Sequence, residues 1–481
     1  MMKVVKSFFQ KYHKLSLPVK ASLWFTICNF MQRGITMITT PIFTRVLSEE
    51  QYGLISTFNS WQTILLMLTS LSLYKAIMNL YIKNDNQEQV LSAVTGLSVL
   101  LTGVWLLIYL LFSDSISTTM QMSKKLVFCL FVTFIAQSVI NCWSVYERYI
   151  YDYRKLIIVT ITLTALSSFL GLVCVLFVSN SAEGRIIPQT IVCAVTGVFL
   201  LVMIFKSDRT FYDKKMWLFS LKFSVGLLPH YLSEFVLQSS DKLMINYMCG
   251  TRDVAMYSVA YSVGTLINMV TAAINSSFGP YQYQKIKAGE YEVLAKRANQ
   301  VLFLVGIMLV GIMLFSREIV LVFGGTRYLE SVDVIVPICV GVYFNYVFQL
   351  FARAQEYYER KLTIVIPSIL CAVLNLVLNY IFIGKFGYQA AAYTTFVCYA
   401  VFCVIHYFFY RKVCKEMLNG ASLYDAKGIL VISIGITAVS AVIMIIIHIL
   451  WLKYLIIAVI LGVLVIKHER VIDLIKGILN K

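Results

Sequence analysis

The sequence predicts an all-α membrane protein with 14 transmembrane helices, built as two six-helix pseudo-symmetric lobes plus two extra C-terminal helices. Its composition, the lengths of its apolar segments and an internal repeat lead to this prediction. Of 481 residues, 59% are hydrophobic and only 14% are charged, and the mean hydropathy is +0.79. A soluble domain is about 45–50% apolar and about 25% charged. So much apolar surface requires a bilayer as its solvent.

The net charge of +17 first suggests a protein that binds nucleic acid. However, the Lys and Arg residues do not gather in one domain but lie in short clusters between apolar segments. This distribution is typical of the positive-inside rule of membrane proteins, so we expect no nucleic-acid partner. The 11 Cys residues form no C-x-x-C motif, and we interpret them as free, mostly buried thiols rather than redox or zinc ligands.

Apolar segments of about 20 residues, the length that crosses the hydrocarbon core, recur along the chain. The predicted spans are residues 19–42, 54–74, 90–112, 124–146, 156–178, 186–205, 218–248, 254–278, 298–315, 333–352, 362–383, 389–410, 428–448 and 451–467. We recognise no cleavable signal peptide before the first span.

The distribution of basic residues predicts the topology. One set of alternating loops, with both chain ends, holds 30 Lys and Arg residues, whereas the opposite loops hold nine. The positive-inside rule therefore places both termini in the cytoplasm, and we expect a multi-pass protein of a bacterial cytoplasmic membrane. The same basic clusters are expected to contact anionic membrane lipids.

An internal repeat predicts the division into lobes. YDYRKLIIV at 151–159 returns as YYERKLTIV at 357–365, with six identities in nine positions. Since six helices separate the copies, the lobes share one orientation and are related by an axis along the membrane normal. The predicted regions are an N-terminal arm (1–18), an N-lobe (19–210), a C-lobe (211–415), and a final region with two helices and a cytoplasmic tail (416–481).

The candidate site begins with a polar stripe on the first span. At about 100° per residue, Arg33 lies on the same side of the helix as Asn29, together with a Ser and three Thr residues. Ionisable residues within a membrane are costly and are functional candidates by default.

The seventh span carries a matching polar face. His230, Glu234, Gln238, Asp241 and Lys242 lie within about 120° of one another around the helix. Their types suggest charge pairing or coupling to an ion. His230 is either a protonatable coupling site or a satisfied core histidine, and we favour the second interpretation.

Milder polar stripes on the second and eighth spans include Asn59 and Asn268. Together, the four helices predict a polar cavity between the lobes, with Arg33, Lys242, Asn29, Asn59 and Asn268 as substrate-binding candidates. Two interpretations of Arg33 stay open. It either contacts a ligand during transport, or pairs with Glu234 or Asp241 as a packing ion pair.

The sequence lacks the motifs of several enzyme classes. The chain has no G-x-x-x-x-G-K-[ST] segment for ATP hydrolysis and no Asp-x-Asp for a metal-dependent glycosyltransferase. Every predicted outer loop is short, which disfavours a membrane polymerase or ligase. We therefore expect a protein that is not an enzyme and that needs no cofactor.

Two segments, TRVLSEEQYG (44–53) and DKLMINYMCGTRDVAMYS (241–258), resemble the Wzx-type oligosaccharide flippases of the multidrug/oligosaccharidyl-lipid/polysaccharide exporter superfamily. The number of spans, the short loops and the repeat extend this resemblance over nearly the whole chain. It implies a secondary transporter that flips undecaprenyl-diphosphate-linked oligosaccharides to the outer leaflet by alternating access, for capsule, exopolysaccharide or O-antigen synthesis. It also implies that Arg33 and Lys242 are cavity cations that face the lipid diphosphate, with Arg45, at the outer end of the first span, as a weaker third substrate-binding candidate.

The resemblance implies polysaccharide polymerases and glycosyltransferases as partners, and it leaves coupling to H⁺ or Na⁺ open. Two alternatives share the architecture. A drug/cation antiporter of the MATE branch would have 12 spans and an acidic cavity, which Glu234 and Asp241 would fit. A lipid II-type flippase would differ only in its substrate.

Overall fold

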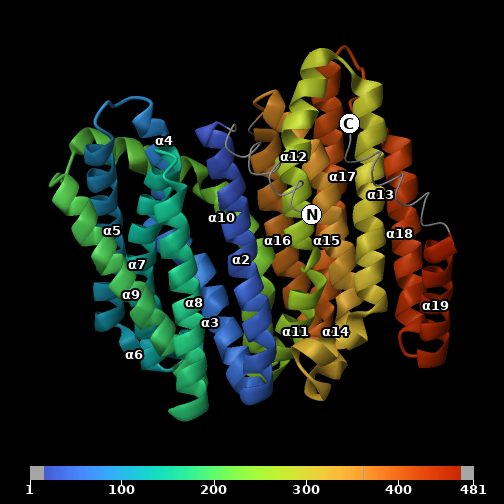
Figure 1. Ribbon diagram of the computed structural model, residues 1–481, viewed down its shortest axis with the longest axis horizontal. Coiled ribbons are helices and arrows are strands. Elements are labelled where there is room, and N and C mark those ends of the chain that lie inside the picture. Colours follow the sequence, from blue (N-terminus) through green and yellow to red (C-terminus); the bar gives the residue numbers. More distant parts are fainter. Residues whose placement is uncertain (1–15, 361, 467–481) are drawn as a thin grey trace, which may run out of the picture. The chain divides into compact units, whose positions relative to one another are not determined.

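The computed structural model of the protein describes residues 16–360 and 362–466 (Figure 1). These residues form α-helices and one short 3₁₀-helix, η1 (Thr326–Ser331), and contain no strand. The prediction of an all-α membrane protein is confirmed. Most of the predicted N-terminal arm and the tail beyond residue 466 lie outside the described residues.

Among the described residues, nine helices are long and apolar enough to cross a membrane. They are α5 (Gln87–Leu111), α7 (Lys124–Tyr149), α8 (Tyr153–Phe177), α9 (Ala182–Ser207), α13 (Tyr291–Leu314), α15 (Val332–Tyr357), α16 (Leu362–Phe386), α17 (Gln389–Met417) and α18 (Ala426–Ile446). Two bent pairs raise the number to 11. These pairs are α3 (Glu49–Ser70) with α4 (Tyr74–Tyr81), bent by 45°, and α11 (Thr251–Gly264) with α12 (Ile267–Ala288), bent by 41°.

Three further helices coincide with the remaining predicted spans. They are α2 (Leu17–Val46), α10 (Lys214–Met248) and α19 (Leu450–Ile466). Helices α2 and α10 are not among the nine because their polar stripes lower their hydropathy. In α19, the apolar stretch Leu450–Val459 is too short to count as a span. Each predicted span therefore has a helix or a bent pair, and the total of 14 stays a prediction.

The chain divides into two compact units, residues 1–255 and 256–481. This division lies later than the predicted lobe boundary at 210/211, because α10 packs against α3, α4 and α5 of the first unit. The lobe boundaries themselves stay a prediction.

The order of elements repeats along the chain. A bent pair, a long helix, an eight-residue helix and three long helices occur first from α3 to α9 and again from α11 to α17. The eight-residue helices are α6 (Ser113–Met120) and α14 (Ser316–Phe323). This order agrees with the two-copy architecture predicted from the sequence.

The repeated nine-residue motif is not in register with this structural repeat. The turns that precede α8 and α16 each contain one left-handed residue, Tyr151 (φ 58°) and Glu359 (φ 55°). These residues are 208 positions apart, whereas the motif returns after 206. Arg154 therefore lies within α8, but Arg360 lies in the turn before α16.

Short polar residues define where many of the helices begin. A side chain just before the helix accepts a hydrogen bond from a backbone N–H in its first turn, which would otherwise lack a partner. The residues that do so are Ser48, Asn86, Ser123, Asp152, Ser181, Asp213 and Asp425. Polar residues between apolar segments thus mark the helix boundaries in the sequence.

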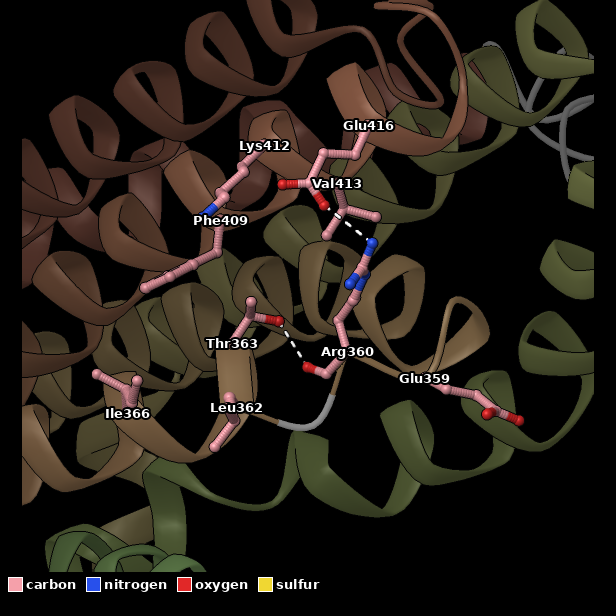
Figure 2. Close-up of a pocket in the computed structure, with 9 residues that line it drawn as sticks. All are labelled: Glu359, Arg360, Leu362, Thr363, Ile366, Phe409, Lys412, Val413 and Glu416. Carbon is pink, nitrogen blue, oxygen red and sulfur yellow. Dashed lines mark hydrogen bonds and ion pairs between the residues drawn. The ribbon is translucent and has the colours of Figure 1, made fainter.

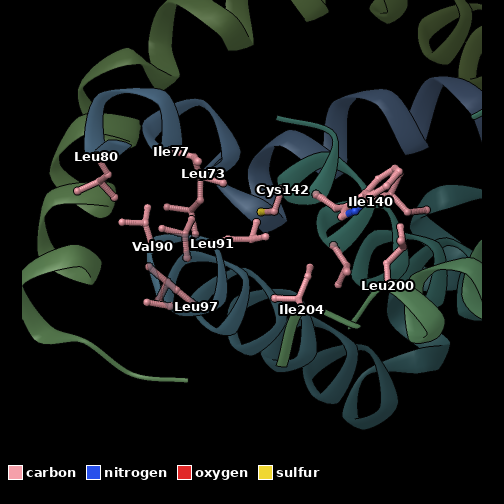
Figure 3. Close-up of a cluster of buried hydrophobic side chains, with 14 of the residues drawn as sticks. Leu73, Ile77, Leu80, Val90, Leu91, Leu97, Ile140, Cys142, Leu200 and Ile204 are labelled. Carbon is pink, nitrogen blue, oxygen red and sulfur yellow. The ribbon is translucent and has the colours of Figure 1, made fainter. Parts of the chain in front are cut away.

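A buried apolar cluster holds the first unit together (Figure 3). It joins Ile77 of α4, Val90 of α5, Ile140 of α7 and Leu200 of α9. Helices α7 and α9 approach closely, since a Cβ placed on Gly197 would lie 2.7 Å from both Cα and Cβ of Ala136. Small residues at such crossings let membrane helices pack closely without a hydrophobic driving force between them.

We expect Gly197→Ala to lower the melting temperature of the detergent-solubilised protein, because the added methyl group forces α7 and α9 apart. Overpacking of this kind costs about 1–3 kcal/mol. Gly103→Ala on α5 is the matched control, since a Cβ there meets no atom within 4 Å. Equal melting of the two variants would contradict the close α7–α9 contact.

Candidate functional site

Helix α2 presents two different faces. One face packs on α8, where Gln32 Nε2 donates to Thr160 O and to Thr164 Oγ1, both at 3.4 Å. Cys28 Sγ lies 3.1 Å from Thr160 Oγ1 on the same side. Asn29 and Arg33 each follow one of these residues by one position, so they lie about 100° further around the helix, and both are exposed. The polar stripe predicted on the first span therefore lies beside the face that packs on α8 and is accessible.

Arg33 is exposed and makes no hydrogen bond or ion pair with another residue of the described chain. Neither Glu234 nor Asp241 pairs with it, although all three belong to the first unit. The alternative in which Arg33 forms a packing ion pair is therefore absent from this conformation. Arg45, in the last turn of α2, is also exposed.

The candidate residues of α10 differ in burial. Asp241 is only 2% exposed and Lys242 is partly buried, whereas Glu234 and Gln238 are exposed. The side chain of His230 lies outside the described set, so its two interpretations stay open. The predicted polar face of the seventh span is therefore part buried and part accessible.

Hydrogen bonds fix the C-terminal part of α10 within the first unit. Thr57 Oγ1 of α3 donates to Asn246 Oδ1 at 3.3 Å, and Asn246 Nδ2 donates to Gln121 Oε1 at 2.8 Å. Asn59, two residues beyond Thr57, is exposed. Helix α3 thus anchors α10 through one side chain and presents another to the solvent.

The structure adds Lys75 to this set. Its Nζ lies 3.0 Å from the centroid of the Tyr231 ring, and its ammonium group interacts electrostatically with Glu234. Lys75 lies in the first turn of α4, the second part of the bent α3–α4 pair, after left-handed residues at Leu71 and Ser72. The predicted second span ends at residue 74 and leaves Lys75 in a loop, because no sequence pattern indicates this bend.

The second unit contains a polar ladder between α12 and α15. Asn275 Nδ2 donates to Gln349 Oε1 at 3.0 Å, and Gln349 Nε2 donates to Asn345 Oδ1 at 3.4 Å. Farther along both helices, Arg353 Nη1 donates to Gln282 Oε1 at 3.0 Å. Sequence reasoning assigned Arg353 only to a basic loop. Asn275 and Gln282 are seven residues apart, which is about two turns of a helix, and this spacing is the sequence signal that could have pointed to the partner of Arg353.

Asn268 precedes Asn275 by one further step of seven residues on α12 and is partly buried. Asn268 therefore lies on the same helix as the ladder. The hydrogen bonds of the ladder begin at Asn275, and none of those described joins the Asn268 side chain to α15. Its predicted role in substrate binding stays a prediction.

The described parts of the chain, 16–360 and 362–466, contain no group of three or more His, Cys, Asp or Glu residues that could hold a metal ion. Among the exposed candidate residues, Arg33 and Arg45 are hydrogen-bond donors suited to an anion, Glu234 is an acceptor suited to a cation, and the Asn and Gln side chains can both donate and accept.

Several solved structures share this fold at low sequence identity. A lipid II flippase MurJ in an inward closed conformation has a TM-score of 0.64 and 16% identity, over 93% of this chain and all of that one. An inward-facing multidrug resistance MATE transporter of the MOP superfamily also scores 0.64, at 13% identity over 81% and 96% of the two chains. A MOP superfamily transporter from Pyrococcus furiosus scores 0.53, at 14% identity over 82% and 95%. The fold is that of MOP-superfamily membrane proteins.

The sequence profile described as "Polysaccharide biosynthesis protein" matches residues 19–284, and the chain belongs to that family. The MatE profile matches residues 228–381. No curated protein matches the sequence. The Wzx-type resemblance agrees with this family.

Gly279 makes room for Arg353, because a Cβ on this glycine would lie 2.7 Å from Arg353 Nη1. We expect Gly279→Ala to displace the guanidinium and leave the fully buried Gln282 without its bond, which costs about 1.5–3 kcal/mol of unfolding free energy. In a Gln282→Leu background, the same change should cost much less. Melting of the four proteins of this double-mutant cycle measures the difference.

Gly311→Ala on α13 is the control for the cycle, since nothing lies within 4 Å of a Cβ there. Additive effects of the Gly279 and Gln282 changes would contradict the argument that both act through the Arg353 bond.

Proposed function

We propose that the protein is a secondary transporter that flips undecaprenyl-diphosphate-linked oligosaccharide units from the inner to the outer leaflet. The observation that carries this proposal is Arg33, a cation on a predicted membrane span with no partner among the described residues. Membership in the polysaccharide biosynthesis family supports the substrate class. In this proposal, glycosyltransferases supply the substrate and a polymerase consumes the product.

The chemistry of Arg33 fits a diphosphate. A guanidinium binds phosphate oxygens through two parallel hydrogen bonds, and it stays charged at every physiological pH. An isolated cation at bilayer depth is costly unless water or an anion compensates it. A hydrated, exposed arginine that receives the diphosphate of a lipid carrier satisfies both requirements, and Lys242 on α10 supplies a second cation of the same unit.

The membrane potential supplies a driving force for this direction of transport. Moving one negative charge outward across an inside-negative membrane is favourable by about 2.3 kcal/mol per 100 mV. Because the cavity cations stay with the protein, the substrate carries the negative charge of its diphosphate across the membrane. Export then needs no ATP, which agrees with the absence of a nucleotide-binding motif from the sequence.

A drug/cation antiporter is the second candidate function. Glu234 and Gln238 are exposed on α10 and offer oxygen atoms to a cation, and the fold resembles a MATE transporter. Lys75 lies beside Glu234 and offsets its charge, which favours the anionic substrate. A lipid II-type flippase shares the diphosphate chemistry and differs in the attached sugar.

We expect Arg33→Ala and Lys242→Ala to abolish surface polymer export while the protein remains in the membrane. Arg33→Lys should retain part of the activity, because it keeps the charge but loses the bidentate geometry. Immunoblots of membrane fractions and quantification of surface polymer measure both effects. Lys287→Ala, an exposed lysine at the end of α12, is the control. Full export by both alanine variants would overturn the proposal.

Purified protein in vesicles separates the candidate functions. Vesicles that contain a fluorescent undecaprenyl-diphosphate sugar should show protein-dependent movement of the label to the opposite leaflet, lost in Arg33→Ala. Transport of a cationic dye under a proton gradient, without lipid flipping, would favour the antiporter instead.

A further inference from the structure

A hollow of about 460 Å³ lies between the start of α16 and the end of α17 in the second unit (Figure 2). Its lining contains four charged and five other side chains, which are Glu359, Arg360, Lys412 and Glu416, and Leu362, Thr363, Ile366, Phe409 and Val413. None of these residues belongs to the candidate transport site. The hollow is therefore a separate feature of the molecule.

The turn before α16 fixes Arg360 at the edge of this hollow. Glu359 adopts a left-handed conformation (φ 55°), and Arg360 N donates to Gln355 O at 2.9 Å, which closes the end of α15. Thr363 Oγ1 donates to Arg360 O at 2.7 Å. Figure 2 shows the guanidinium of Arg360 directed toward Glu416, which it pairs with at 2.9 Å.

The two cations at the hollow are accessible. The side chains of Arg360 and Glu416 are 44% and 39% exposed, so their ion pair is open to competition from another anion. Lys412 is exposed and has no hydrogen bond or ion pair to any residue in the described portion of the chain. The hollow therefore offers two cations to an incoming phosphate, Lys412 directly and Arg360 by exchange from its exposed pair, beside the carboxylates of Glu359 and Glu416.

Charged and apolar groups are separated along the helix axes. Arg360 precedes α16, whereas Ile366 lies more than one turn into that helix, and α17 runs from Phe409 toward Lys412 and Glu416. The apolar wall continues along α16, where exposed side chains recur every three or four residues. They are Ile366, Ile369, Leu370, Val373, Leu376 and Val377. A charged rim followed by an apolar wall is the order of groups in one lipid molecule.

The predicted topology places the charged rim on the cytoplasmic side, because Arg360 and Lys412 belong to loops of the 30-residue basic set. The inner leaflet carries anionic phospholipids, which basic residues at the membrane surface attract. The rim thus lies at headgroup level and the apolar wall at acyl-chain level.

We propose that this hollow binds an anionic phospholipid of the cytoplasmic leaflet. Lys412 and Arg360 hold the phosphate, and Leu362, Ile366 and Phe409 contact the first part of an acyl chain. The site takes only its membrane orientation from the proposed topology, and it does not require the transport cycle.

The test measures binding to the full-length protein in detergent by its thermal stabilisation. Dioleoylphosphatidylglycerol should raise the melting temperature saturably, and dioleoylphosphatidylcholine should not. A surface cation near anionic lipid contributes enough to change affinity by about fivefold. We therefore expect Lys412→Gln to raise the half-saturating lipid concentration about fivefold, and the Lys412→Gln, Arg360→Gln double variant about 25-fold.

Three comparisons make the result specific. Lys287→Gln removes an exposed basic charge of the same predicted side outside the hollow and should bind as wild type. Arg33→Ala should also bind normally, so a failed transport proposal leaves this one standing. Soluble glycerol 1-phosphate, which lacks a chain, should stabilise the protein far less than the lipid does.

Unchanged lipid affinity in Lys412→Gln would overturn the proposal, and this variant breaks no described ion pair, so its folding is not at issue. Equal losses in Lys287→Gln would show general surface attraction instead of a site. Full stabilisation by glycerol 1-phosphate would show a free-anion site, and preference for undecaprenyl diphosphate over phosphatidylglycerol would assign the hollow to the transported lipid.

Discussion

Hydrogen-bond satisfaction in the absence of water is the constraint on which this structure depends. The hydrocarbon core offers no partner to a backbone N–H or C=O group, so the spanning segments become helices. Short polar side chains follow the same rule by bonding within their own helix. Ser98 donates to Val94 O at 2.9 Å, and Thr133 donates to Cys129 O at 2.7 Å. Local bonding satisfies many polar groups, and the proposed function rests on Arg33, which stays exposed without a partner among the described residues.

Close approach is the second recurring device. Gly197 admits Ala136 at the α7–α9 crossing, and Gly279 admits the guanidinium of Arg353 between α12 and α15. In the first case a missing side chain permits helix packing, and in the second it permits a charged group to reach a buried amide. The absence of a glycine side chain thus allows close packing in the apolar core of one unit and in the polar ladder of the other.

The cations of the chain divide by environment. Arg33 lies exposed on a predicted span, Lys75 contacts an aromatic ring and a carboxylate of α10, and Arg353 is held by the fully buried Gln282. Lys412 lies at the rim of a hollow with an apolar wall. In our proposals, the surroundings of Arg33 suit an anion in transit and those of Lys412 a lipid headgroup, whereas Lys75 and Arg353 are fixed internal charges. A count of basic residues treats all four alike.

The sequence by itself determined the all-α membrane class, the positions of the helices and the polar faces of α2 and α10, because hydropathy and helical periodicity are local properties of the chain. The element order agrees with the predicted two copies, yet the nine-residue motif that suggested them lies two residues out of register with the turns. Only the tertiary structure decided that α10 packs with α3 to α5, that Lys75 joins Tyr231, and that Arg353 joins Gln282. Those contacts depend on helix bends and on packing between residues distant in the chain, which no local pattern encodes.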